Sequence, residues 1–255
     1  MCSLILQRQS GQEWPLLLAA NRDERLSRPS RPPARHWPEW PEVVAGLDEL
    51  AGGSWLGLND HGLIAAVLDR AGSLGPQTRT RSRGELVLEA LDHAEAQEAV
   101  GALADLNPDA YAPFNLIVAD PRYAYWVRHG GDGEIRVHPI ADGLHMITST
   151  ELDDLSHPRI RRFLPQFREA SSPQPGDDPR LEDFAAWIAL LQSRDAGDGD
   201  AAAAMNLESE AGGDSVATVA SSLIAMPAYP GFERRARWWH AHGSPDRVPF
   251  LAVET

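Results

Sequence analysis

The sequence has almost no cysteine, because Cys2 is the only one among 255 residues. A single cysteine cannot form a disulfide within the chain, which favours a reducing compartment. It also excludes a zinc site built from several cysteines, and no other metal site is predicted. The chain lacks an apolar run near the ~18 residues of a membrane span, and its N-terminus lacks the pattern of a secretory signal. We therefore expect a cytoplasmic protein with no membrane span.

Positive charge is also scarce. The 37 acidic residues outnumber the 23 basic ones and give a formal net charge of −14. Nucleic-acid binding needs a basic field, and so does docking on anionic lipid, so we expect neither partner. The hydrophobic share of 43% is that of an ordinary globular protein. A chain of this length can form one large core, so we expect a single domain over residues 1–255.

Two apolar runs near the N-terminus predict a hairpin that ends in a polar cluster. Residues 2–8 and 15–20 have the composition of strands and are separated by a short polar turn. The second run leads directly into Asn21-Arg22-Asp23-Glu24. The pairing of the two strands would bring Cys2 close to this cluster.

Cys2 can be interpreted in two ways. If Met1 is removed, Cys2 carries both a nucleophilic sulfur and a free α-amine, whose reference pKa near ~8 lets it act as the base. Asp23 could then hold that amine in place. Alternatively, Cys2 fills space as a small hydrophobe and the polar cluster is a solvated strand end. The residues alone leave both interpretations open.

The rest of the chain alternates between predicted hairpins and helices. Strands are expected over 51–59, 63–68, 114–120, 123–128, 134–139, 144–149, 215–226, 232–240 and 248–253. Helices are expected over 82–94, 96–106 and 181–193 and from Pro158 onward, and residues 82–85 have the form of a capping box. The prolines between 25 and 41 predict an extended surface loop, and residues 171–180 and 196–204 predict flexible segments. Helices packed on mostly antiparallel sheets follow from this order.

Two tryptophans in the proline-rich loop, Trp37 and Trp40, have two explanations. They can pin the loop to the core, which is the commoner use of a buried aromatic side chain. They can also form an aromatic wall over a pocket. We favour the first explanation.

Several motifs together resemble the NRDE family, which is the family of the transport and Golgi organization protein 2. The resemblance is carried by Cys2, by Asn21-Arg22-Asp23-Glu24 and by the block from Gly52 to Asn59. Matches at residues 82–86, 113–116, 143–145 and 221–223 extend it over nearly the whole chain. It implies an α+β fold of the N-terminal-nucleophile hydrolase type, a four-layer αββα sandwich of mostly antiparallel sheets.

The resemblance also implies a site and a reaction. Cys2 would be the nucleophile of a cysteine amidohydrolase that cleaves an amide or related acyl bond in a small-molecule substrate, and Asp23 would partner its α-amine. Asn21 and Arg22 would lie at the edge of the site. Related amidohydrolases place an oxyanion-binding asparagine where this chain has Ser149, and such a donor is typically worth ~3–4 kcal/mol. Asn59 or backbone amides could compensate.

A second function is implied by the same family. Other members are implicated in haem trafficking, so the alternative is a non-catalytic haem-binding protein on the same fold. Hydrolysis would require no cofactor, whereas the alternative would use haem held noncovalently. The sequence identifies no axial ligand and no oligomeric state.

Overall fold

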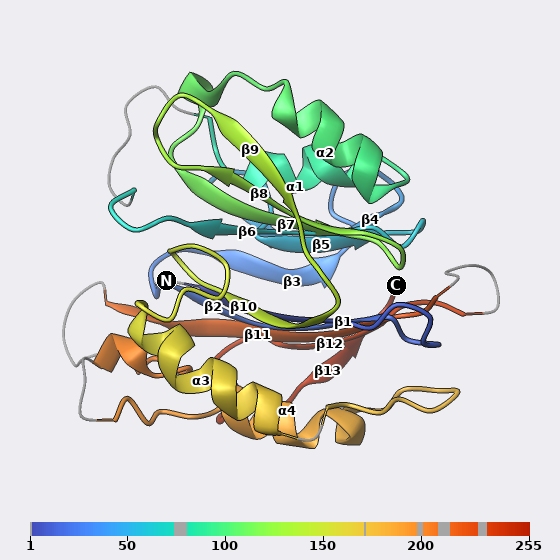
Figure 1. Cartoon of the computed structure of the whole chain (residues 1–255), viewed down its shortest axis with the longest axis vertical. Coiled ribbons are helices and arrows are strands. Elements are labelled where there is room, and N and C mark those ends of the chain that lie inside the picture. The colour runs from blue at the N-terminus through green and yellow to red at the C-terminus, as the bar shows by residue number, and fades with distance from the viewer. Residues whose placement is uncertain (1, 74–80, 171, 198–200, 209–214, 229–233) are drawn as a thin grey trace.

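The computed structural model describes residues 2–73, 81–170, 172–197, 201–208, 215–228 and 234–255. Two antiparallel sheets lie face to face, and helices cover the outer face of each (Figure 1). This is the four-layer αββα sandwich that the sequence predicts. No helix among the described residues has the length and apolarity needed to cross a bilayer.

The first sheet holds both ends of the described chain. Its six strands run in the order β10-β1-β2-β11-β12-β13. Their bounds are β10 Gly143–Ile147, β1 Ser3–Arg8, β2 Leu16–Arg25, β11 Val216–Met226, β12 Arg237–Ala241 and β13 Leu251–Val253. The outer face of this sheet packs on α3 (Pro158–Glu169) and α4 (Ala185–Leu191). The predicted hairpin of β1 and β2 is confirmed, and β2 is longer than expected because it includes the polar cluster.

The second sheet is formed by the middle of the chain. Its seven strands follow one another in chain order. They are β3 Ser30–Ala34, β4 Val43–Asp48, β5 Leu56–Asn59, β6 Ile64–Asp69, β7 Phe114–Ala119, β8 Ala124–His129 and β9 Ile135–Pro139. Helices α1 (Gly84–Leu91) and α2 (Ala96–Ala104) pack on its outer face. The predicted hairpins of β5 with β6 and of β7 with β8 are both present.

Strand alternation sorts the apolar side chains into three layers. On β1 and β2, Leu4, Leu6, Leu16 and Leu18 point between the sheets, where they pack with residues of the second sheet. Their neighbours, including Ile5 and Leu17, point outward and pack under α3 and α4. These strands are therefore buried on both faces, which explains why their sequences are continuously apolar.

Some local predictions were wrong. The proline-rich segment contains β3, an edge strand, where Pro32 and Pro33 are tolerated because one side of the strand needs no hydrogen-bond donor. Residues 82–85 form no capping box, since α1 begins at Gly84 and the side chain of its N-cap residue, Arg83, makes no capping hydrogen bond; Ser82 Oγ accepts instead from Gly84 N at 3.2 Å. Part of the segment expected to be flexible is a short 3-10 helix, Ala201–Ala203, followed by the buried Met205. Residues 198–200 of that segment lie outside the described residues.

The predicted helices are shorter than expected, and the two tryptophans are placed as we favoured. The segment expected to be one helix over 181–193 is a 3-10 turn, Leu181–Phe184, followed by α4. Trp37 and Trp40 are half-buried and pack against the cluster under α1 and α2. They therefore pin the proline-rich segment to the core.

A glycine on β4 makes room for Trp55, which precedes β5. A Cβ atom added at Gly46 would lie 2.3 Å from the indole of Trp55. We expect Gly46→Ala to lower the free energy of unfolding by about 1–3 kcal/mol, the usual cost of overpacking. Gly101 in α2 is the control, because its added Cβ would meet nothing within 4 Å. Gly101→Ala should raise stability by about 0.5–1 kcal/mol. Urea unfolding measures both, and equal effects would contradict the packing argument.

Candidate functional site

The thiol of Cys2 lies between the two sheets. Ser3 on β1 pairs with Asn21 on β2, so Cys2 lies at the end of the sheet that carries the polar cluster. Cys2 packs with the cluster of side chains between the sheets, and its Sγ is 3.9 Å from the backbone oxygen of Asp23. Cys2 as a residue is therefore half-buried just before the first strand, and its thiol faces the second sheet.

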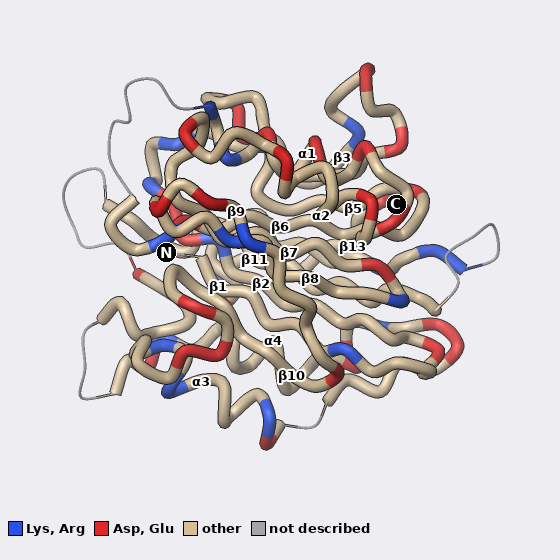
Figure 2. The backbone as a smooth tube through the Cα atoms, turned by 45° about the horizontal axis from the view of Figure 1, so that its top comes forward, with Lys and Arg blue, Asp and Glu red and all other residues tan. Residues whose placement is uncertain are grey.

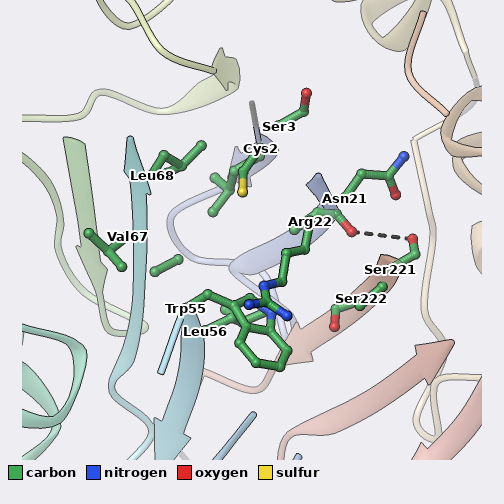
Figure 3. Close-up of a pocket in the computed structure, with 14 residues that line it drawn as sticks. Cys2, Ser3, Asn21, Arg22, Trp55, Leu56, Val67, Leu68, Ser221 and Ser222 are labelled. Atoms are coloured by element: carbon green, nitrogen blue, oxygen red, sulfur yellow. Dashed lines mark hydrogen bonds between the residues drawn. The ribbon is translucent and has the colours of Figure 1, made fainter. Parts of the chain in front are cut away.

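A small cavity adjoins this thiol (Figure 3). Strands β1, β2 and β11 form one wall, and β6 with the start of β5 forms the other. Its lining is mainly apolar, and the residues in it that carry polar groups are Cys2, Ser3, Asn21, Arg22, Trp55, Ser221 and Ser222. The space open to a water-sized sphere is about 20 Å³, which is enough for a single water molecule.

Burial controls the ionisation of Cys2. The loss of hydration raises the pKa of the thiol to about 11, and the nearby carboxylates of Asp69 and Asp23 raise it further. The thiol is therefore protonated at neutral pH. A reaction at this sulfur requires a base that removes its proton.

The carboxylate of Asp23 lies on the other face of the sheet. One oxygen accepts a hydrogen bond from Thr218 Oγ1 at 2.7 Å, and the other accepts one from Arg159 Nη1 at 2.7 Å. Arg159 on α3 also donates to Ser3 Oγ at 2.7 Å. Both side chains of the ion pair are fully buried. Asp23 is thus fixed by an ionic network that joins α3 to β1, β2 and β11.

Asn21 shares the outer face with Asp23. Its amide nitrogen donates to the backbone oxygens of Leu191 and Met205, each at 2.9 Å. Asn21 lines the cavity, but in Figure 3 its side chain points away from the Cys2 thiol. It holds the end of α4 and the segment that contains Met205 against the sheet.

Arg22 faces the cavity. Its guanidinium lies 4.1 Å from the centre of the Trp55 ring, and Figure 3 shows the side chain extending from β2 toward that indole. Only 5% of Arg22 is exposed. Burial lowers the pKa of its guanidinium, while Cys2 and the acidic side chains Glu24 and Asp48 act in the opposite direction. Of the four residues of the polar cluster, Arg22 is the one whose charged group enters the space between the sheets beside Cys2.

The other two predicted residues, Asn59 and Ser149, are not among those that line this cavity. Asn59 donates to the backbone oxygens of Leu91 and His93 and accepts from the backbone nitrogens of His61 and Leu63, so its amide holds the end of α1. Ser149 follows β10, the neighbour of β1, and lines a separate pocket.

Sequence reasoning missed a second polar pair near the cavity. Ser222 on β11 is directly opposite His240 on β12, and Ser222 Oγ lies 2.9 Å from His240 Nδ1. Burial lowers the pKa of His240 to about 3, and the charges of His242 and Arg22 contribute. His240 is therefore neutral at physiological pH. Neither this pair nor Arg159 has a sequence signal, since strand pairing and helix packing bring these residues together.

Comparisons with known proteins agree with this architecture. Residues 1–220 match the model of the family described as Transport and Golgi organisation 2. The chain belongs to this family. Its human relative, a Transport and Golgi organization protein 2 homolog, is 38% identical over 116 residues, and its bovine counterpart is 37% identical over 123. Each match covers 44% of this chain and 41% of the relative, so the chain matches about two-fifths of the length of these relatives.

Solved structures share the fold at low sequence identity. A Caenorhabditis elegans ortholog of N-acylethanolamine-hydrolyzing acid amidase superposes with a TM-score of 0.59 at 14% identity, over 100% of both chains. A conjugated bile acid hydrolase from Clostridium perfringens superposes with a TM-score of 0.51 at 11% identity, over 100% of this chain and 97% of the other. At this identity the likeness establishes the N-terminal-nucleophile hydrolase fold.

The buried ion pair predicts a large effect of single substitutions. Arg159→Met would leave the Asp23 carboxylate buried without its cation, so we expect a loss of about 3–5 kcal/mol in the free energy of unfolding. Replacing both partners, as in Asp23→Leu with Arg159→Met, should cost clearly less than the two single changes added together. Arg162→Met, one turn along α3, is the control because its pair with Asp195 is partly exposed and worth at most about 1 kcal/mol. Equal losses for Arg159→Met and Arg162→Met would contradict this assignment.

Proposed function

We propose that this protein hydrolyses an amide or related acyl bond of a small substrate, with Cys2 as the nucleophile after removal of Met1. The observation that carries the proposal is the position of the thiol at the end of a central strand, open to a cavity between the two sheets. The fold and the family support it. The family resemblance implies that the α-amine of Cys2 acts as the base. A chain that retains Met1 has no free α-amine on Cys2.

The proposed reaction uses the thiol of Cys2, which lies on the inner face of the first sheet, and the α-amine of the same residue. The sulfur attacks the carbonyl carbon from the inner face, and the thiol proton passes to the α-amine of the same residue. When the C–N bond breaks, the amine leaving group takes up that proton and a thioester remains on Cys2. Water then attacks the thioester, which releases the acid and restores the thiol.

Asp23 can assist from the outer face. The main-chain nitrogen of residue 2 lies between the two faces of the strand, whereas the thiol points inward and the carboxylate outward. A carboxylate held by Arg159 and Thr218 is too constrained to move to the sulfur. Its proposed role is therefore to orient and stabilise the protonated α-amine.

Acylation of Cys2 tests the proposal. We expect protein without Met1 to gain one acyl group when incubated with a cysteine-directed acylating probe, as measured by intact mass. Cys2→Ser and the chain that retains Met1 are the controls, and both should gain much less. Equal labelling with and without Met1 would show that the α-amine is not the base and would remove this mechanism.

The raised pKa of Cys2 gives a separate pH prediction. In the chain that retains Met1, alkylation by iodoacetamide should become about tenfold faster per pH unit from pH 7 to pH 10, because only the thiolate reacts and its fraction rises throughout this range. Removal of Met1 should shift the midpoint of this profile to lower pH, since the α-amine then takes up the proton. The alkylation rate at each pH is measured by intact mass on samples quenched at successive times. A plateau below pH 9 in the unprocessed chain would contradict the buried setting of the thiol.

Haem binding remains a prediction of the family resemblance. The space beside Cys2 is far smaller than a porphyrin, so haem would occupy a different part of the surface. Titration with haem at micromolar concentration measures it through the Soret band. A saturable shift would support this second function, and an unchanged band would remove it.

A further inference from the structure

Arg22 carries a hydrogen-bonding group that the fold leaves unused. Its Nη1 atom is buried and has no hydrogen-bond partner among the described residues. Only 5% of the Arg22 surface is exposed, so the residue is more than nine-tenths buried. A buried donor without a partner is costly, and a charged one more so. Because Arg22 lines the cavity, a ligand bound there could supply the missing acceptor.

The acidic neighbours of Arg22 do not satisfy this atom. Glu24 and Asp48 approach the other terminal nitrogen, Nη2, at 3.9 and 3.8 Å, which is longer than a hydrogen bond. Asp48 is instead bonded to Arg28, whose Nε lies 2.7 Å from the carboxylate. The two acids balance the charges of Arg22 and Arg28 at a distance, and Nη1 has no hydrogen-bond partner among the described residues.

The fold holds Arg22 in this position. Trp55 stacks on the guanidinium, and Gly46 leaves the room that the indole needs. In Figure 3 the guanidinium and Ser222 lie on the same side of the cavity, and the Cys2 sulfur lies apart from both. The nucleophile and the free donor thus occupy different parts of one small space.

The surroundings favour an anionic partner for Arg22. His240, which bonds Ser222, is neutral, so Arg22 is the cationic group beside the cavity and His240 adds no second cation next to Ser222. The hydroxyl of Ser222 adds a further polar atom to the cavity lining. A carboxylate fits this arrangement because its oxygens accept from a guanidinium along a planar edge.

We infer that Arg22 is a specificity-determining residue that binds a carboxylate on the acyl part of the substrate. The inference rests on the proposed function for the direction of the substrate. The acyl group stays on the sulfur after the C–N bond breaks, whereas the amine must leave toward solvent. The buried side of the cavity, where Arg22 lies, therefore receives the acyl group. A short acyl group such as succinyl needs the least room beyond the single-water space that the structure has beside Cys2.

Binding and acylation are measured separately to test this inference. Binding uses Cys2→Ser protein and calorimetry with N-methylsuccinamate, which carries one carboxylate, and with its uncharged diamide. We expect the acid to bind about tenfold or more tightly than the diamide, the usual effect of a charged hydrogen bond. Arg22→Met in the same background should abolish this preference. Arg22→Lys should retain part of it, and Arg31→Met, a surface arginine paired with Glu49, should leave it unchanged.

Acylation uses Met1-free protein with succinyl 4-nitroanilide and its carboxamide analogue. The bond from Sγ to the carbonyl carbon forms, the C–N bond breaks, and 4-nitroaniline leaves with the thiol proton. The acid should react at least about tenfold faster than the carboxamide, and Arg22→Met should remove that ratio.

The outcomes separate the two proposals. Equal affinity for acid and diamide, or a preference that persists in Arg22→Met, overturns the inference about Arg22. Carboxylate binding without any acylation leaves that inference standing and overturns the hydrolytic function. Acylation without a carboxylate preference leaves the hydrolytic function standing and overturns the inference about Arg22. If Arg22→Met does not fold, the comparison of acid with diamide on the Cys2→Ser protein and on Arg22→Lys decides.

Discussion

The fully buried ion pair between Asp23 and Arg159 constrains this end of the molecule. Both groups are removed from water, so each depends on the other and on the hydroxyls of Thr218 and Ser3. These four side chains come from β1, β2, β11 and α3. The arrangement is costly to disturb, because separation would leave a charge buried without its partner. It therefore fixes the strand ends between which Cys2 and Arg22 lie.

Because side chains alternate along β2, those of the polar cluster point to both faces of the sheet. Asn21 and Asp23 serve the outer layer, where they attach helices to the sheet. Arg22 lies between them in sequence and points to the inner layer, beside the thiol and the indole of Trp55. A short run of polar residues thus both attaches the outer layer to the sheet and places a guanidinium beside the cavity. A residue inserted or removed here would exchange the two roles.

The sequence predicts the layers better than it predicts the site. Apolar runs separated by turns are local signals, so the hairpins of β1 with β2 and β7 with β8 could be predicted. The edge strand β3 could not, because prolines usually exclude a strand and only its place at the sheet edge permits them. Arg159 and His240 were missed because their partners are distant in sequence. Asn59 belongs to a motif of the family, yet its hydrogen bonds hold the end of α1 and the turn that follows β5, away from the cavity beside Cys2.

Burial acts on the two inward groups in the same direction, toward the uncharged state. It raises the pKa of Cys2 to about 11 and lowers that of Arg22, so this setting disfavours both a thiolate and a guanidinium cation. A carboxylate bound at Arg22 would relieve the cation and, as a further negative charge, would raise the pKa of the thiol again. A substrate of this class therefore makes direct ionisation of the sulfur harder. Its reaction would depend on proton transfer within residue 2, which is the step that a free α-amine supplies.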